Sequence, residues 1–112
     1  MGESILNSVK SMIGSDADYE IYNPDFIILI NSALAHLNDL GAGPSEPFCI
    51  TGPSETWDDF TDDKFIKAKA SEFVWLDVKL KFDPPTTSFV LKSSEDMRKE
   101  CEWRIERYTS EH

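Results

Sequence analysis

Positively charged residues are missing from most of the first half of this 112-residue sequence. No Lys or Arg occurs from Met12 through Asp63, whereas eleven Asp or Glu lie in that stretch. The whole chain has a formal net charge of −10. A DNA-binding module of this size is usually basic, because contacts with phosphate groups dominate its affinity. The charge argues against DNA binding and leaves two interpretations: a surface that only keeps the protein soluble, or one past which DNA moves without adhering.

Long hydrophobic runs and targeting signals are also absent. The longest apolar run, Phe26–Ile30, has five residues, far fewer than the roughly 20 that cross a bilayer. The start of the chain, Met1–Leu6, resembles neither a secretory signal peptide nor a myristoylation signal, which needs Ser or Thr at the sixth position. We therefore expect a soluble protein that is made inside the cell and has no membrane partner.

The residue types that usually carry chemistry are few and scattered. Cys49 and Cys101 lack the spacing of a metal site, and a cytosolic origin favours two reduced, half-buried thiols over a disulfide. His36 is predicted to lie on a helix surface, and His112 ends the sequence. The Gly-rich stretch 41–44 follows a helix, whereas nucleotide-binding loops follow a strand and open a helix. We expect no enzyme activity, no metal and no other cofactor.

Hydrophobic periodicity predicts a single, mainly α-helical domain over residues 1–112. The expected fold is a small bundle of about four helices, with a long loop or short β-hairpin between the second and third. The helices are expected at residues 4–13, 24–40, 57–82 and 93–108, the loop at 41–56, and a short strand within it at 48–51.

Capping signals define the expected helix ends. Asn23 is predicted to cap the second helix, with a proline at its first position. Thr56 is predicted to cap the third helix. This helix is expected to end at the Asp-Pro-Pro sequence of residues 83–85, and a break near Thr61 is compatible with the sequence. Residues 86–91 are expected to form an extended connector, and Ser93 or Ser94 is predicted to cap the last helix that follows it.

The third predicted helix has apolar side chains on two sides. Ile66, Phe73 and Leu80 are spaced by seven residues, and a second stripe follows Val74 at intervals of four. Such a helix is either central in a bundle or shared between the core and a neighbouring subunit. Candidate subunit contacts are Val74, Trp75, Val78 and Phe82 on this helix and Trp103, next to Arg107, on the last one. Trp75 is equally compatible with simple packing in the core.

Three stretches, in this order, resemble the head–tail connector family of tailed phages, whose members are also described as head completion or portal-adaptor proteins. They are residues 30–44, Trp57–Phe60 and Leu80–Phe89. The last is the most specific, because an apolar helix broken by Asp-Pro-Pro and followed by a Ser/Thr run is uncommon. The resemblance covers roughly residues 4–108.

This resemblance implies a structural virion protein that assembles in the bacterial host cytoplasm. Copies of the chain would form a ring at the head–tail junction of the virion. The ring would dock on the portal protein after DNA packaging, extend the DNA channel and offer an attachment surface to a downstream adaptor or tail protein. DNA would pass through the ring without specific binding.

Two further sets of residues are candidates for contacts in such a ring. Channel-facing acidic candidates are Asp58, Asp59, Asp62 and Asp63, and candidates for contact with the portal or tail are Arg104, Arg107 and Tyr108. The acids at 58–63 also suit the positive end of a helix dipole, which is the simpler explanation of their position. Two alternative functions remain: an acidic DNA mimic, and a general helical protein-interaction module.

Overall fold

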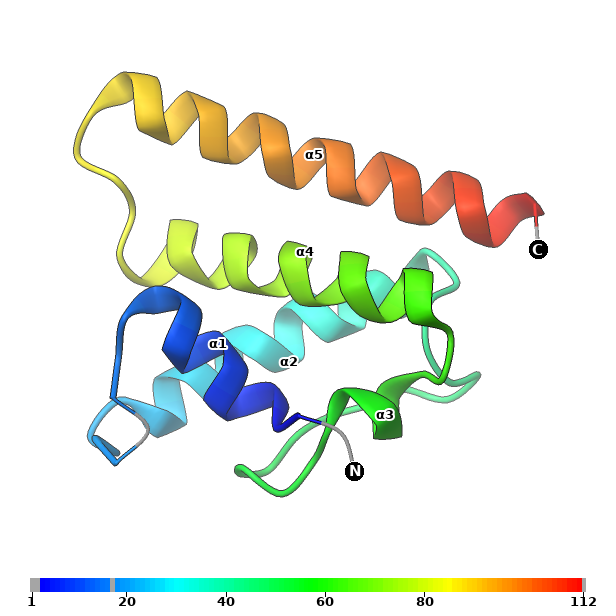
Figure 1. Cartoon of the computed structure of the whole chain (residues 1–112), viewed down its shortest axis with the longest axis horizontal. Coiled ribbons are helices and arrows are strands. Elements are labelled where there is room, and N and C mark those ends of the chain that lie inside the picture. The colour runs from blue at the N-terminus through cyan, green and yellow to red at the C-terminus, as the bar shows by residue number, and fades with distance from the viewer. Residues whose placement is uncertain (1–2, 17, 112) are drawn as a thin grey trace.

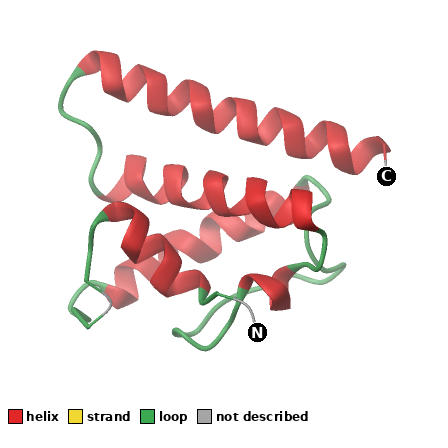
Figure 2. Cartoon of the chain, viewed as in Figure 1, coloured by secondary structure: helices red, strands yellow, loops and turns green. Residues whose placement is uncertain are grey.

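The computed structural model describes residues 3–16 and 18–111, and within them the chain forms five helices and no β-strand (Figure 2). The predicted mainly helical bundle is confirmed. The helices are α1 (Ile5–Ile13), α2 (Asn23–Asp39), α3 (Trp57–Phe60), α4 (Lys64–Phe82) and α5 (Ser88–Glu111).

Helix α4 is the centre of the bundle and contacts each of the other four helices. α5 runs along one side of α4, while α1, α2 and α3 cover the other side (Figure 1). Buried residues come from both predicted stripes, including Ile66 and Phe73 from one and Val74 and Val78 from the other. Both apolar stripes of α4 therefore pack into the core of the monomer.

The predicted third helix is two helices, and the break lies near Thr61 as the sequence allowed. Thr61 is extended, with φ −161° and ψ 150°, and α4 starts three residues later. The break lets α3 turn Trp57 and Phe60 into the core, where they are 3% and 2% exposed. The indole N–H of Trp57 donates to the hydroxyl of Ser8 at 3.0 Å, which fixes α3 against α1.

The last helix begins at Ser88, five residues before the predicted start, and it ends at Glu111 instead of 108. The predicted extended connector and the predicted caps Ser93 and Ser94 are therefore wrong, since both serines lie inside the helix. Thr87 is the reason: its hydroxyl accepts from the N–H of Val90 at 3.4 Å, and its carbonyl accepts from the N–H of Leu91 at 3.0 Å. Thr87 thus provides the N-terminal cap.

The predicted cap of α2 is also wrong, because Asn23 is the first helical residue and Tyr22 precedes it without a side-chain cap. The Asn23 side chain instead accepts a hydrogen bond from the Lys10 ammonium at 2.8 Å. Lys10 is 0% exposed and also donates to the carbonyl of Tyr19 at 2.8 Å. One buried lysine of α1 therefore fixes both the linker and the start of α2.

The loop between α2 and α3 does not form the predicted strand at 48–51. Its centre, Ile50, is 1% exposed, and the Asn31 side chain takes the place of a strand partner. The Ile50 N–H donates to Asn31 Oδ1 at 2.7 Å, and Asn31 Nδ2 donates to the Ile50 carbonyl at 3.0 Å. A side chain of α2 thus satisfies the buried backbone of the loop.

Replacing Lys10 by Met should lower the free energy of unfolding by about 2 kcal/mol, because charge-assisted hydrogen bonds to Tyr19 and Asn23 are lost. Lys64→Met is the matched control, since Lys64 is exposed, and it should change stability by less than about 0.5 kcal/mol. Urea unfolding followed by circular dichroism measures both. Equal stability of the two variants would show that Lys10 does not hold the linker.

Candidate functional site

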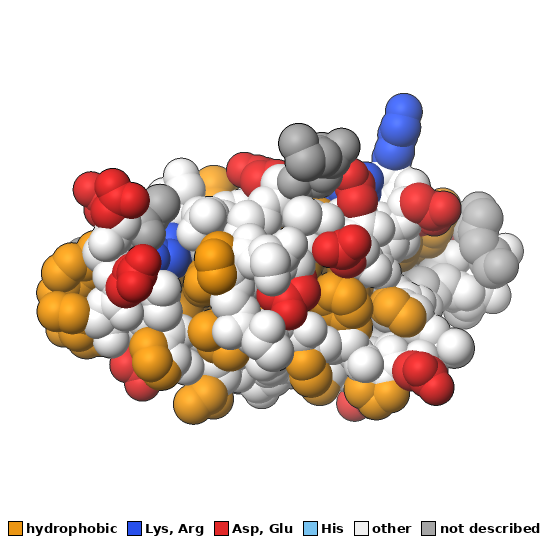
Figure 3. All heavy atoms as spheres, turned by 90° about the horizontal axis from the view of Figure 1, so that it is seen from below, with side chains coloured by type: hydrophobic (Ala, Val, Ile, Leu, Met, Phe, Trp, Pro, Cys, Tyr) orange, Lys and Arg blue, Asp and Glu red, His pale blue; other side chains and the backbone are white. Residues whose placement is uncertain are grey.

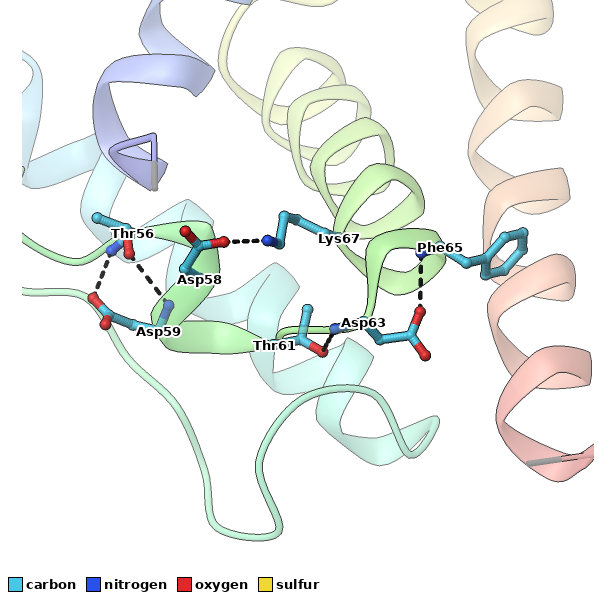
Figure 4. Close-up of polar contacts among 7 residues, drawn as sticks. All are labelled: Thr56, Asp58, Asp59, Thr61, Asp63, Phe65 and Lys67. Atoms are coloured by element: carbon cyan, nitrogen blue, oxygen red, sulfur yellow. Dashed lines mark hydrogen bonds and ion pairs between the residues drawn. The ribbon is translucent and has the colours of Figure 1, made fainter. Parts of the chain in front are cut away.

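The predicted acidic cluster surrounds the break between α3 and α4 (Figure 4). Thr56 and Asp59 form a reciprocal capping box around the first turn of α3. The Asp59 N–H donates to the Thr56 hydroxyl at 3.2 Å, and the Thr56 N–H donates to the Asp59 carboxylate at 2.9 Å. Asp59 therefore stabilises the start of this helix, whatever else it contacts.

Asp63 joins the start of α4 to α5. Its carboxylate caps α4 by accepting from the N–H groups of Phe65 and Ile66 at 2.9 and 3.1 Å. It also accepts from the Tyr108 hydroxyl of α5 at 2.7 Å, and this hydrogen bond raises the pKa of Tyr108. The Tyr108 ring stacks on Phe65 with 4.4 Å between the ring centroids. Tyr108, predicted to contact the portal or tail, is thus already engaged within its own chain.

The other two acids are more accessible. Asp58 is paired with Lys67 of α4, and the hydrogen bond from this lysine is the main reason that the pKa of Asp58 is lowered. Asp62 is exposed and makes no hydrogen bond or ion pair with the residues that the structure describes. Of the four predicted channel acids, Asp62 therefore has the carboxylate most available to solvent.

The predicted subunit contacts are buried, half-buried or exposed in the structure. Val74 and Val78 are 0% exposed and belong to the core, which corrects their assignment, since they present no surface to a neighbour. Phe82 packs on Phe26 with 4.5 Å between ring centroids, and Trp75 is half-buried against the core. Trp103 is 53% exposed, so it remains available to a partner.

The exposed side of α5 carries the two predicted arginine contacts. The Arg107 guanidinium lies 5.3 Å from the centroid of the Trp103 ring, which confirms their predicted pairing. Arg107 is also paired with Glu111, and Arg104 is paired with Glu100, at 3.3 and 3.1 Å. Exposed pairs of this kind contribute little to stability, so both guanidinium groups remain free to pair with the carboxylates of a partner.

Two ion pairs of the buried Asp77 carboxylate lie where α5 packs on α4, and the sequence pattern indicates only one of them. The Asp77 side chain is 8% exposed, and its carboxylate pairs with Arg98 at 2.8 Å and with Lys81 at 3.1 Å. The spacing of four between Asp77 and Lys81 is a recognisable helix pair, whereas Arg98 comes from another helix. The Arg98 pair therefore joins α5 to α4.

The same ion pairs line a groove of about 450 Å³ between α2, α4 and α5. His36 lies on the rim of this groove, with 47% of its side chain exposed, which confirms its predicted surface position. Its Nε2 is 3.1 Å from the Glu102 carboxylate, and its ring stacks on Phe73 with 5.5 Å between centroids. The contacts of His36 thus connect α2 to α4 and α5.

The two cysteines have different environments. Cys101 is buried, and burial together with the nearby carboxylate of Glu72 raises the pKa of its thiol to about 12. Cys49 is exposed, not half-buried as predicted, and neither cysteine forms a disulfide. Among residues 3–16 and 18–111, no three His, Cys, Asp or Glu side chains gather as a metal ion would require, and no helix is long and apolar enough to cross a membrane.

The face of the molecule away from α5 is acidic and apolar. Figure 3 shows acidic and hydrophobic side chains side by side on this face, with few Lys or Arg side chains. The exposed hydrophobic residues of the first half of the chain include Met12, Ile21 and Ile28. The shortage of Lys and Arg in the first half of the sequence therefore also appears on this face of the molecule.

Asp59→Ala should lower the free energy of unfolding by about 1 kcal/mol, because it removes half of the capping box. Asp62→Ala removes the same charge from an exposed carboxylate that contacts no hydrogen-bond or ion-pair partner among the described residues, and it should cost less than about 0.5 kcal/mol. Thermal or urea unfolding distinguishes the two variants. A larger loss for Asp62→Ala than for Asp59→Ala would contradict these assignments.

Comparison with protein families gives a match over most of the chain. A family model described as phage connector protein matches residues 5–112. No curated protein and no solved structure matches the chain. Because the family match covers nearly every residue, including all five helices, the chain belongs to the phage connector protein family.

Proposed function

We propose that this chain is a non-catalytic structural subunit of a ring that joins the head and tail of a phage virion. The observation that carries the proposal is the match to the phage connector family over residues 5–112. In this proposal the ring docks on the portal protein after DNA packaging. It then extends the DNA channel and provides the surface to which a downstream adaptor or the tail attaches.

Exposed apolar side chains support a role in assembly. Trp103 and Phe89 on α5 are 53% and 80% exposed, and Ile21 and Ile28 are 68% and 67% exposed. Large exposed hydrophobic residues on a small protein are typical of protein–protein contacts. Copies of the chain and the portal and tail proteins are the partners that such surfaces would meet.

The charge of the chain supports passage of DNA without binding. The stretch from Met12 through Asp63 has no Lys or Arg, and the face away from α5 is rich in acidic side chains (Figure 3). DNA phosphates are repelled by such a surface, so DNA would not adhere to it. Asp62 and Asp58 are the best channel-facing candidates of the cluster, because Asp59 and Asp63 are committed to helix caps.

Electron microscopy of particles from the phage or induced prophage that carries this gene, with the gene deleted, tests the proposal. We expect free tails beside heads that are empty or leaking DNA, because the junction cannot form. Expression of the intact gene in the host should restore tailed virions, whereas the same gene with an early stop codon is the control and should not. Tailed, infectious particles in the deletion strain would refute the connector function.

A further inference from the structure

An aromatic groove lies where the end of α1 meets the end of α4 that leads into the loop to α5 (Figure 1). Its rings follow one another with 6.0, 5.4 and 4.5 Å between successive centroids, in the order Tyr19, Tyr22, Phe82 and Phe26. The groove has a volume of about 410 Å³ and is also lined by residues 13–16. The two tyrosines are 46% and 43% exposed, so their rings are accessible to a partner.

The charges at the aromatic groove are mainly negative. Asp16 lines the groove, and Asp18, Glu20 and Asp25, which follow it in the sequence, are exposed. The sequence from Met12 through Asp63 contains no Lys or Arg, so the linker and α2 supply no cation to these carboxylates. The groove therefore combines accessible aromatic rings with a negatively charged rim.

Two cations of the neighbouring helices are already bound within the chain. Lys10 of α1 is 0% exposed, and its ammonium donates to the Tyr19 carbonyl and to the Asn23 side chain, each at 2.8 Å. Lys79, three residues before Phe82 on α4, is paired with Asp83 at 3.2 Å. These two cations offset part of the negative charge, but the carboxylates around the groove, Asp83 included, still outnumber them.

The chemistry of the groove fits a cationic side chain with an apolar stem. The face of an aromatic ring attracts a Lys ammonium or an Arg guanidinium within about 6 Å of the ring centroid. A nearby carboxylate adds a charge-assisted hydrogen bond. The methylene groups of Lys and Arg cover apolar surface at the same time. A segment that carries Lys or Arg between apolar residues therefore complements both the rings and the rim.

Another copy of this chain is a poor source of such a segment. Its net charge of −10 favours oppositely charged partners over further copies at an acidic groove. Its lysine-rich stretch, Lys64–Lys69, belongs to α4, where Ile66 is 4% exposed and packs into the core. Arg104 and Arg107 of α5 alternate with acidic residues and are paired with them. A different protein with a basic segment is the better occupant.

We propose that the aromatic groove is a docking site for a segment of a partner protein that carries Lys or Arg between apolar residues. The inference rests on the proposed function, whose partners are the portal and tail proteins, and adds the chemistry by which one of them is held. α4 has 19 residues and is about 28 Å long, which separates the groove at its end from Asp62 before its start. Docking in the groove therefore leaves Asp58 and Asp62 uncovered.

Titration of the purified, isotope-labelled chain with synthetic peptides, followed by nuclear magnetic resonance, tests the proposal. A short peptide of alternating Arg and Leu should bind with a Kd below about 1 mM and shift the amide signals of Gly14 and Ser15 more than those of α5. A peptide of alternating Glu and Leu should bind at least about tenfold more weakly, because the acidic rim repels it. A peptide of alternating Arg and Ser should also bind more weakly, because it cannot cover the rings.

Variants of the groove separate its two components. Tyr19→Ala removes a ring and Asp16→Asn removes a carboxylate, and each should weaken binding of the Arg-Leu peptide about two- to fivefold. Both side chains are exposed, so folding should persist. Trp103→Ala and Asp62→Asn are the matched controls, since they remove an exposed ring and an exposed carboxylate elsewhere, and they should bind the peptide like the wild type.

Three results in this titration would overturn the proposal: no binding of the Arg-Leu peptide, equal binding of the Glu-Leu peptide, or unchanged binding by the variant that combines Tyr19→Ala with Asp16→Asn. In intact particles, a photoreactive phenylalanine derivative in place of Tyr19 identifies the occupant by mass spectrometry of the linked peptide. We expect a segment of another virion protein that carries Lys or Arg. Linkage to a second copy of this chain, or to a segment without Lys and Arg, would contradict the proposal.

Failure of this inference is separable from failure of the proposed function. A groove that binds no basic peptide, in a phage whose tails still detach when the gene is deleted, would overturn the docking site and leave the connector function standing. Tailed, infectious particles after deletion would refute the connector function, whereas binding of the Arg-Leu peptide by the purified chain would still support the docking site.

Discussion

The packing of α4 between α5 on one side and α1, α2 and α3 on the other is the constraint on which the rest of the structure depends. This helix is apolar on two sides, and each of the other helices in the described part of the chain packs against it. α1, α2 and α3 cover one side, and α5 covers the other (Figure 1). α5 does so with the buried residues Cys101 and Ile105, the ion pair of Arg98 with Asp77, and the contacts of Tyr108 with Asp63 and Phe65, and the residues on its opposite side are exposed. The core of the monomer therefore leaves α5 free to meet partners.

The acidic residues have two kinds of role, and the structure separates them. Asp59 and Asp63 hold helix starts, which agrees with the simpler explanation that the sequence offered for the cluster. Asp62 and the acids of the segment 18–28 are exposed and unevenly placed. A DNA mimic would need carboxylates in regular rows at the spacing of phosphates, whereas these acids lie at a helix break and in a linker. A surface past which DNA moves requires only net negative charge, which makes the connector function the better account.

Local patterns predicted the parts of the fold that depend on neighbours in the sequence. The two stripes of α4, the Thr56 cap and the contact between Trp103 and Arg107 follow from spacings of three, four or seven residues. Contacts between distant residues escaped prediction, as for Asn31 with Ile50 and Tyr108 with Asp63. The same limit explains the errors at candidate sites: Val74 and Val78 were assigned to an interface because no local rule shows which stripe the monomer itself covers.

Cryo-electron microscopy of the neck of intact particles tests the central claim most directly, because it shows which chains lie between portal and tail. The account predicts a ring below the portal whose subunits fit the five-helix fold, with the long α5 packed along α4. The acidic face would line the channel. A neck whose density is fully explained by other chains, with no subunit of this fold, would contradict the account.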